Sequence, residues 1–135
     1  MISKKRLIKS FLEMYNSIMF KKIGIIYKES LSFDADISDH IETILSHSKE
    51  LYFHESAADA PKDFPKLSKD ELGNQSDLII VFGGDGTMLS TAREFIGYDI
   101  PIMGVNFGQV GFLTDSSENN FKQSIDDVFN NNFKL

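Results

Sequence analysis

The sequence contains no cysteine, which excludes disulfide bonds and thiolate metal sites. This absence is compatible with a reducing cytoplasm, the location that we expect. No apolar run approaches the roughly 18 residues that a membrane span needs. Positive charge is not in excess either, since the net charge is -6 at pH 7, whereas nucleic-acid-binding domains are usually basic. We therefore expect neither a nucleic acid nor a membrane as a partner.

What remains is the composition of a globular protein, in which 135 residues with 41% hydrophobic and 25% charged side chains suit one compact domain. The charge is unevenly distributed. Residues 1–22 hold six basic side chains against Glu13 alone, a net charge of +5, which leaves -11 for the rest of the chain. The basic N-terminal segment is therefore expected to be separate from the acidic remainder of the chain.

Residues 4–19 predict an amphipathic helix, because their apolar side chains recur at helical spacing along one stripe. Three interpretations remain open. The helix packs on the domain; it is a membrane-surface or targeting helix, as basic amphipathic helices can be; or it is upstream sequence and the biological start is Met19, directly before the first expected strand. We treat residues 1–18 as an N-terminal extension.

Short apolar runs alternate with amphipathic stretches through the rest of the chain. Strands are expected at residues 22–27, 51–53, 77–82 and 100–105, helices at 34–47, 67–72, 88–96 and 118–130, and a loop at 57–66. Asp34 or Asp36 is expected to cap the first helix, Gly73 to end the second and Gly97 the third. Such alternation predicts a Rossmann-like α/β fold of about four parallel strands, with helices on both faces of the sheet.

A glycine-rich turn, Gly83-Gly84-Asp85-Gly86-Thr87, joins the most apolar expected strand to the next helix. Ligands of open α/β sheets bind at the carboxyl ends of the strands. Glycines let backbone N–H groups approach a phosphate, and the following helix adds the positive end of its dipole. We therefore expect Gly83, Gly84, Gly86 and Thr87 to form a phosphate loop, with Thr87 as the helix cap. The loop is neither a Walker A motif nor G-x-G-x-x-G.

Asp85 is an odd residue for plain anion binding, since a carboxylate repels phosphate. It suits a general base for a hydroxyl nucleophile, or a ligand directed at magnesium. The alternative is a tight strand–helix turn with an incidental aspartate.

A second segment, residues 106–115, follows the next expected strand and also carries glycines. Loops at the ends of successive strands can line one crevice. Within this segment, Asn106 is either a turn residue or a polar ligand contact. Phe112 is either a plate that stacks on an aromatic base or a core residue, and the residues alone favour the core.

The two segments together resemble the NAD kinases. Residues 77–89, DLIIVFGGDGTML, are similar to the glycine-loop pattern of that family, and residues 101–114, PIMGVNFGQVGFLT, are similar to its pattern P-x-x-G-x-N-x-G-x-x-G-F-L. Gly-Gly-Asp-Gly-Thr alone is shared with diacylglycerol and sphingosine kinases, which do not carry the second pattern. The resemblance covers residues 19–135 and implies phosphorylation of NAD to NADP, with ATP or polyphosphate as the donor.

The resemblance also implies roles for individual residues. Asp85 would be the catalytic base toward the 2′-hydroxyl of the adenosine ribose. Gly86 would contact the dinucleotide, Phe112 would pack against the adenine, and Asn106 is assigned as a further NAD contact. Mg²⁺ would accompany ATP, and we assign it no ligand in this chain. Full-length members are commonly dimers or tetramers, so a homo-oligomer is expected.

Two departures from the family pattern stand out. Ser90 occupies a position where some members carry a basic residue, and the family's C-terminal β-rich domain, with its Asn-Glu/Asp motif, has no counterpart here. We therefore expect a fragment with little activity alone, divided into the extension 1–18, the N-terminal α/β domain 19–125 and the start of a link, 126–135. The alternatives are a diacylglycerol-type lipid kinase, against which residues 101–114 argue, and a non-catalytic nucleotide-binding module.

Overall fold

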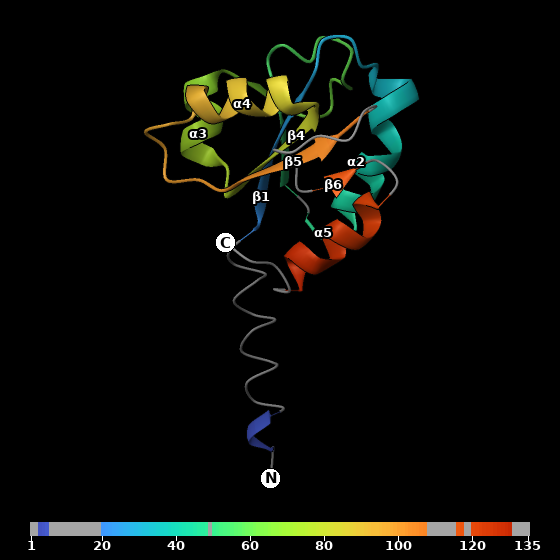
Figure 1. Ribbon diagram of the computed structural model, residues 1–135, viewed down its shortest axis with the longest axis vertical. Coiled ribbons are helices and arrows are strands. Elements are labelled where there is room, and N and C mark those ends of the chain that lie inside the picture. Colours follow the sequence, from blue (N-terminus) through green and yellow to red (C-terminus); the bar gives the residue numbers. More distant parts are fainter. Residues whose placement is uncertain (1–2, 6–19, 49, 108–115, 118–119, 131–135) are drawn as a thin grey trace.

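The computed structural model describes residues 3–5, 20–48, 50–107, 116–117 and 120–130 (Figure 1). Most of the helix expected at 4–19 lies outside the described residues, as do Phe112 and the rest of segment 108–115.

Six parallel strands form a single sheet in the order β3-β2-β1-β4-β5-β6. The strands expected from the sequence correspond to β1, β2, β4 and β5. The other two are edge strands of two residues each, too short to produce a pattern in the sequence. The bounds are β1 Lys22–Tyr27, β2 Glu50–His54, β3 Lys66–Leu67, β4 Leu78–Gly83, β5 Ile102–Asn106 and β6 Ser116–Ser117.

Helices cover both faces of this sheet, which confirms the Rossmann-like α/β expectation (Figure 1). On one face lie α3, Lys69–Gln75, and α4, Asp85–Glu94. On the other lie α2, Ser38–Leu45, and α5, Phe121–Phe129, with a π-helical turn η1, Phe33–Ile37, leading into α2.

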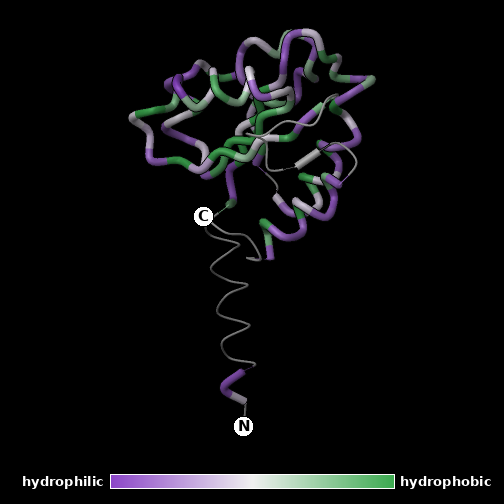
Figure 2. The backbone as a smooth tube through the Cα atoms, viewed as in Figure 1, coloured by the Kyte–Doolittle hydropathy of each residue, from purple (hydrophilic) through white to green (hydrophobic). Residues whose placement is uncertain are grey.

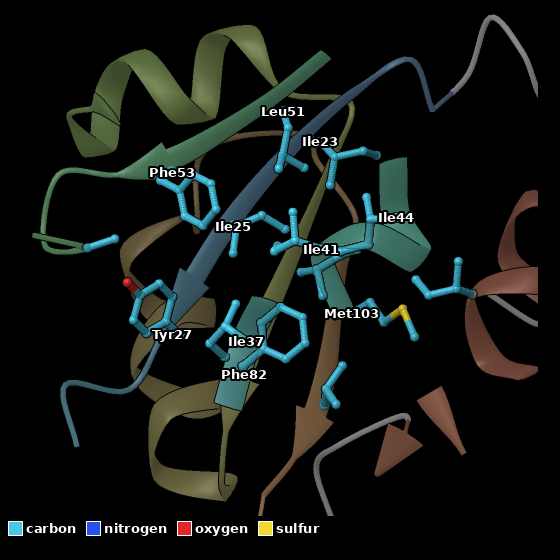
Figure 3. Close-up of a cluster of buried hydrophobic side chains, with 14 of the residues drawn as sticks. Ile23, Ile25, Tyr27, Ile37, Ile41, Ile44, Leu51, Phe53, Phe82 and Met103 are labelled. Atoms are coloured by element: carbon cyan, nitrogen blue, oxygen red, sulfur yellow. The ribbon is translucent and has the colours of Figure 1, made fainter. Parts of the chain in front are cut away.

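The central strand β4 is buried on both sides, as a parallel strand between two helical layers must be. Ile80 and Phe82 point into the larger core beneath α2 and α5, whereas Ile79 and Val81 point into the smaller core beneath α3 and α4. Figure 3 shows the larger core, where side chains of α2 lie over those of β1. In Figure 2, apolar residues concentrate along the central strands and hydrophilic ones along the outer turns.

Two expected helix ends are wrong in the same region. Leu67 belongs to β3, and α3 begins only after Ser68, whose side chain and that of Glu71 form a capping box. Gly73 does not end α3 but lies inside it. A Cβ at Gly73 would lie 2.6 Å from Cδ1 of Tyr98, so the position is occupied by glycine because an aromatic ring packs directly against the helix.

The cap expected at Asp34 or Asp36 is also wrong. Ser32 is the N-cap of η1, and its Oγ accepts a hydrogen bond from the N–H of Ala35 at 3.4 Å. The carboxylate of Asp36 accepts from the N–H of Ser32 at 2.8 Å in return. The aspartate therefore acts as the back-bonding partner in a reciprocal arrangement of the capping-box type.

Candidate active site

The order of the strands places a crevice at the carboxyl ends of β1 and β4. From β1 the chain crosses over to β2 on one side, and from β4 it crosses to β5 on the other, so these two neighbours form the switch point at which open α/β sheets bind ligands. The N–H of Lys28, just beyond β1, donates to the carbonyl of Phe82 at 2.9 Å. The glycine loop begins at the next residue, Gly83.

The loop turns from strand to helix within a single residue. Gly83 is the last residue of β4, Gly84 is the N-cap in an extended conformation, and α4 starts at Asp85. Thr87 therefore lies in the first turn of α4, and the expectation that it caps the helix is wrong. The N-cap Gly84 itself has no side chain with which to cap α4. Because the first N–H groups of a helix have no partner within it, this end of α4 suits a phosphate.

The glycines of the loop differ in what they do. A Cβ on Gly83 would lie 2.7 Å from Oγ1 of Thr87 and 2.8 Å from its Cβ, so buried Gly83 makes room for Thr87. Gly86 is exposed, and a Cβ there would have nothing within 4 Å. Packing therefore requires glycine at position 83, whereas at position 86 it leaves the backbone exposed.

The two sequence motifs meet across the sheet. Gly83 pairs with Asn106 in register, and the N–H of Phe107 donates to the carbonyl of Gly83 at 2.8 Å. The side chain of Asn106 is 7% exposed, and its Oδ1 lies 4.0 Å from the position of a Cβ on Gly84. Asn106 thus lies beside the loop that carries half-buried Asp85. The structure brings these residues together, whereas Phe112 lies outside the described part.

Aromatic rings support the Asn106 side of the loop. The imidazole of His40, on α2, stacks on Phe82 with ring centroids 5.7 Å apart. The same imidazole meets the rings of Phe107 and Phe121 edge to face, at 5.5 and 4.6 Å. These packed rings therefore support the end of β5, where the second sequence segment begins.

On the other side of the loop, an open groove of about 530 Å³ lies between the strand ends and α4. Its walls include Lys28 at the end of β1, His54 and Ser56 at the end of β2, and one face of α4. Lys28, His54 and Ser56 could not be identified from the sequence, because single polar residues after a strand form no motif. Only the pairing of β1 with both β2 and β4 brings them to one place.

A hydrogen-bonded clamp fixes the end of β1. The hydroxyl of Tyr27 donates to Asp59, whose other oxygen accepts from the N–H of Phe33 at 2.7 Å. The hydrogen bond from Phe33 and then that from Tyr27 hold the pKa of Asp59 below its usual value, while burial and the bond to Asp59 raise the pKa of Tyr27. The clamp ties the loop at 57–66 to the strand that borders the groove.

Within the described ranges, no three His, Cys, Asp or Glu side chains gather in a way that could hold an ion. Mg²⁺ is commonly bound by one or two carboxylates together with substrate phosphates. Asp85 beside a phosphate loop fits that pattern, in which the metal arrives with the donor.

Comparison with known proteins identifies the family. The family model "ATP-NAD kinase N-terminal domain" matches residues 6–133. The chain belongs to the NAD kinase family. An NAD kinase of Natranaerobius thermophilus is 32% identical over 117 residues, which cover 85% of this chain and 41% of the relative. One of Hydrogenovibrio crunogenus is 37% identical over 115 residues, covering 82% and 40%. The chain therefore spans about two fifths of the length of these relatives.

The fold agrees with the NAD kinase assignment. The crystal structure of yeast NADH kinase complexed with NADH superposes with a TM-score of 0.64 at 21% identity, covering 82% of this chain and 38% of that one. Because the matched family model is that of the NAD kinases, the lipid-kinase interpretation of the glycine loop is set aside. Across the described residues, the helices are too short or too polar to cross a membrane.

Proposed function

We propose that this chain forms one wall of an NAD kinase active site, which transfers the γ-phosphoryl group of ATP to the 2′-hydroxyl of the adenosine ribose of NAD. The observation that carries the proposal is the position of Asp85. It opens α4 between Gly84 and Gly86, at the switch point of the sheet and beside Asn106. A carboxylate at that point can accept a proton, whereas a loop that only binds anions would not need one.

In the proposed reaction, Asp85 accepts the proton of the 2′-hydroxyl as the hydroxyl oxygen attacks the γ-phosphorus. The bond from that phosphorus to the bridging oxygen breaks, ADP leaves and NADP forms. Phosphoryl transfer depends almost entirely on positioning and electrostatic stabilisation. We assign Gly84, Gly86 and the first turn of α4, including Thr87, to the phosphates.

The acceptor would lie on the Asn106 side. We assign Asn106 and Gly86 as polar contacts of NAD and Phe112 as the plate beside its adenine. Mg²⁺ would be held by the donor phosphates, where it would neutralise charge on the transferred group. These assignments follow the resemblance of residues 77–89 and 101–114 to the family patterns.

We further propose that the complete protein acts in the cytoplasm as a homo-oligomer, with ATP or polyphosphate as donor. Residues 1–18 would be an extension, 19–125 the N-terminal domain and 126–135 the start of a link to a C-terminal domain. A non-catalytic nucleotide-binding module is the second candidate.

Two measurements on the 135-residue chain separate these candidates. NADP formation from Mg²⁺, ATP and NAD is followed by enzymatic cycling, and NAD binding is followed by calorimetry. We expect binding with little turnover, and no residual turnover in Asp85→Asn. Turnover as fast as that of a complete family member would contradict the one-wall proposal, and failure to bind either nucleotide would contradict the assigned site altogether.

A further inference from the structure

We propose that His40 is a positioning residue for the dinucleotide. Its imidazole holds both ends of residues 107–121, which in the sequence include nearly all of the second segment, and thereby fixes Asn106 beside the glycine loop. The inference rests on the proposed function for the identity of the ligand, NAD. It adds to the acceptor side of the site a residue of α2 that lies far in sequence from both motifs.

The backbone that carries His40 is held by the core. His40 lies in α2, three residues after Ile37 and four before Ile44, whose side chains are fully buried. Residues three and four apart share one face of a helix, so His40 lies on the same side of α2 as these two isoleucines. Its half-buried ring is therefore directed toward the core from a fixed backbone.

The ring of His40 contacts three aromatic rings that come from separate parts of the sequence. It stacks on Phe82, with centroids 5.7 Å apart and planes inclined by 19°. It meets the ring of Phe107 edge to face at 5.5 Å and that of Phe121 at 4.6 Å. Phe82 in turn contacts Phe107 and Phe121, at 5.9 and 5.5 Å. The four side chains thus form one cluster, which we call the four-ring cluster, with separations typical of favourable aromatic pairs.

Each phenylalanine of the four-ring cluster borders a functional part of the chain. Phe82 directly precedes Gly83, the first residue of the glycine loop. Phe107 directly follows Asn106, and Phe121 is the first residue of α5. The chain therefore leaves the cluster at Phe107 and returns to it at Phe121. A segment whose two ends are held has fewer conformations to lose when it binds a ligand.

The cluster acts on the site through Asn106. The N–H of Phe107 donates to the carbonyl of Gly83 at 2.8 Å, and Oδ1 of Asn106 lies 4.0 Å from the position of a Cβ on Gly84. If Phe107 moved away, this hydrogen bond would open and the backbone of Asn106 would be held from one side only. The ring that holds Phe107, that of His40, therefore holds Asn106 beside the loop.

The contact is a feature of this chain rather than of the motif. In the pattern P-x-x-G-x-N-x-G-x-x-G-F-L the position of Asn106 is specified, whereas Phe107 occupies an open position. An aromatic residue there is not required by the pattern, and neither is a histidine at position 40, which lies outside both motifs. The pair can therefore be changed without altering any residue that the motifs specify.

Hydrogen exchange of the ¹⁵N-labelled 135-residue chain tests the contact without a ligand. The Phe107 amide exchanges when its hydrogen bond to Gly83 opens, which requires Phe107 to leave the ring of His40. His40→Leu keeps an apolar, helix-favouring side chain but removes the flat ring. It should speed exchange at Phe107 about threefold to tenfold, the factor expected for one aromatic pair. The amide of Ile79, bonded to Pro101 at 3.0 Å at the other end of the same strand pair, should not change. Equal acceleration at both amides, or none at Phe107, would overturn the proposal.

His47→Leu is the matched control. The imidazole of His47 stacks on Phe129 with centroids 4.8 Å apart and bonds to Asp126 at 2.9 Å, so it also joins the α2 side of the core to α5. The same substitution there should lower the urea midpoint, as His40→Leu does, without speeding exchange at Phe107. His40→Phe, which keeps a flat ring, should exchange at nearly the natural rate. Equal acceleration in His40→Phe and His40→Leu would show that the flat ring is not what holds Phe107.

Calorimetry on the same variants connects the contact to the ligand. His40→Leu should weaken NAD binding about threefold to tenfold and leave ATP binding unchanged, because we assign the phosphates to the first turn of α4 rather than to the Asn106 side. His40→Phe should bind NAD nearly as the natural chain does. Equal weakening of NAD in His47→Leu, or equal weakening of ATP in His40→Leu, would reduce His40 to a residue that only stabilises the fold.

Failure of this inference and failure of the proposed function give different results. If the natural chain binds NAD and His40→Leu binds it equally well, the positioning role of His40 is wrong and the NAD site stands. If the natural chain does not bind NAD while exchange at Phe107 responds to His40→Leu, the contact stands, and the assigned ligand is wrong together with the proposed function.

Discussion

Replacing either of two glycines of the same loop by alanine should have opposite effects on stability. A methyl group at Gly83 would meet three atoms of Thr87 at 2.7–3.1 Å, closer than packed atoms tolerate. Thr87 cannot easily retreat, because it lies in the first turn of α4 and its carbonyl accepts the hydroxyl of Thr91 at 2.8 Å. Overpacking of this kind costs about 1–3 kcal/mol. We expect Gly83→Ala to lower the free energy of unfolding by that amount.

Gly86→Ala is the matched control. It adds the same methyl group three residues later, inside α4, at a position with nothing within 4 Å. Alanine is favoured over glycine in a helix by about 0.5–1 kcal/mol. This variant should therefore be as stable as the natural chain or slightly more so, while its methyl group covers backbone that we assign to the dinucleotide.

Urea unfolding followed by far-ultraviolet circular dichroism measures both effects. The midpoint should fall for Gly83→Ala and stay or rise for Gly86→Ala, with unchanged slopes. NAD binding, measured by calorimetry, should weaken in Gly86→Ala in spite of its stability. Equal midpoints for the two variants would refute the distinction between a glycine needed by packing and one available to a ligand.

Three further predictions concern the base, the clamp and the N-terminus. In the complete protein, Asp85→Asn should lower kcat by about 10²–10⁴ with NAD affinity nearly unchanged, because the amide keeps the shape but not the basicity; a near-normal kcat would exclude the base role. Asp59→Asn should lower the urea midpoint at neutral pH. Since the pKa of Asp59 is depressed in the folded chain, its stabilisation is present above the ordinary value of 3.8 and is lost as the pH falls through the depressed value, so the two midpoints should converge in acid. Constant separation of the midpoints would contradict this. A chain that begins at Met19 should keep cooperative thermal unfolding, whereas loss of cooperativity would show that residues 1–18 complete the core.

The central strands were predictable because burial on both faces leaves a continuous apolar run. Residues 22–27 were expected as a strand and form β1 with the same bounds, and the expected strand at 77–82 is shifted by one residue. The edge strands β3 and β6 were not predictable. With two residues each, they depend on pairing with β2 and β5 rather than on their own sequence.

Helix ends were harder to predict than helices, since their determinants are tertiary. Glycine commonly ends a helix, which is why Gly73 was expected to end α3. Instead, the ring of Tyr98, distant in sequence, packs against this position and requires a glycine inside the helix. In the glycine loop, α4 starts at Asp85 rather than at the expected Met88, because Gly84 alone makes the turn. The groove residues Lys28 and His54 could not be found at all from the sequence, since parallel pairing is what brings the ends of β1 and β2 beside α4.

The pairing of Gly83 with Asn106 explains why two sequence motifs form a single candidate site. Parallel strands in register end at the same edge of the sheet, so the residues that follow β4 and β5 emerge side by side. The hydrogen bond from the N–H of Phe107 to the carbonyl of Gly83 continues this pairing one residue past β5. The ring of His40, on α2, packs against the rings of Phe82 and Phe107. The relative position of Asp85 and Asn106 is therefore set by the most buried part of the sheet. A substitution that shifts either strand end would disturb both motifs at once, even where it touches neither of them.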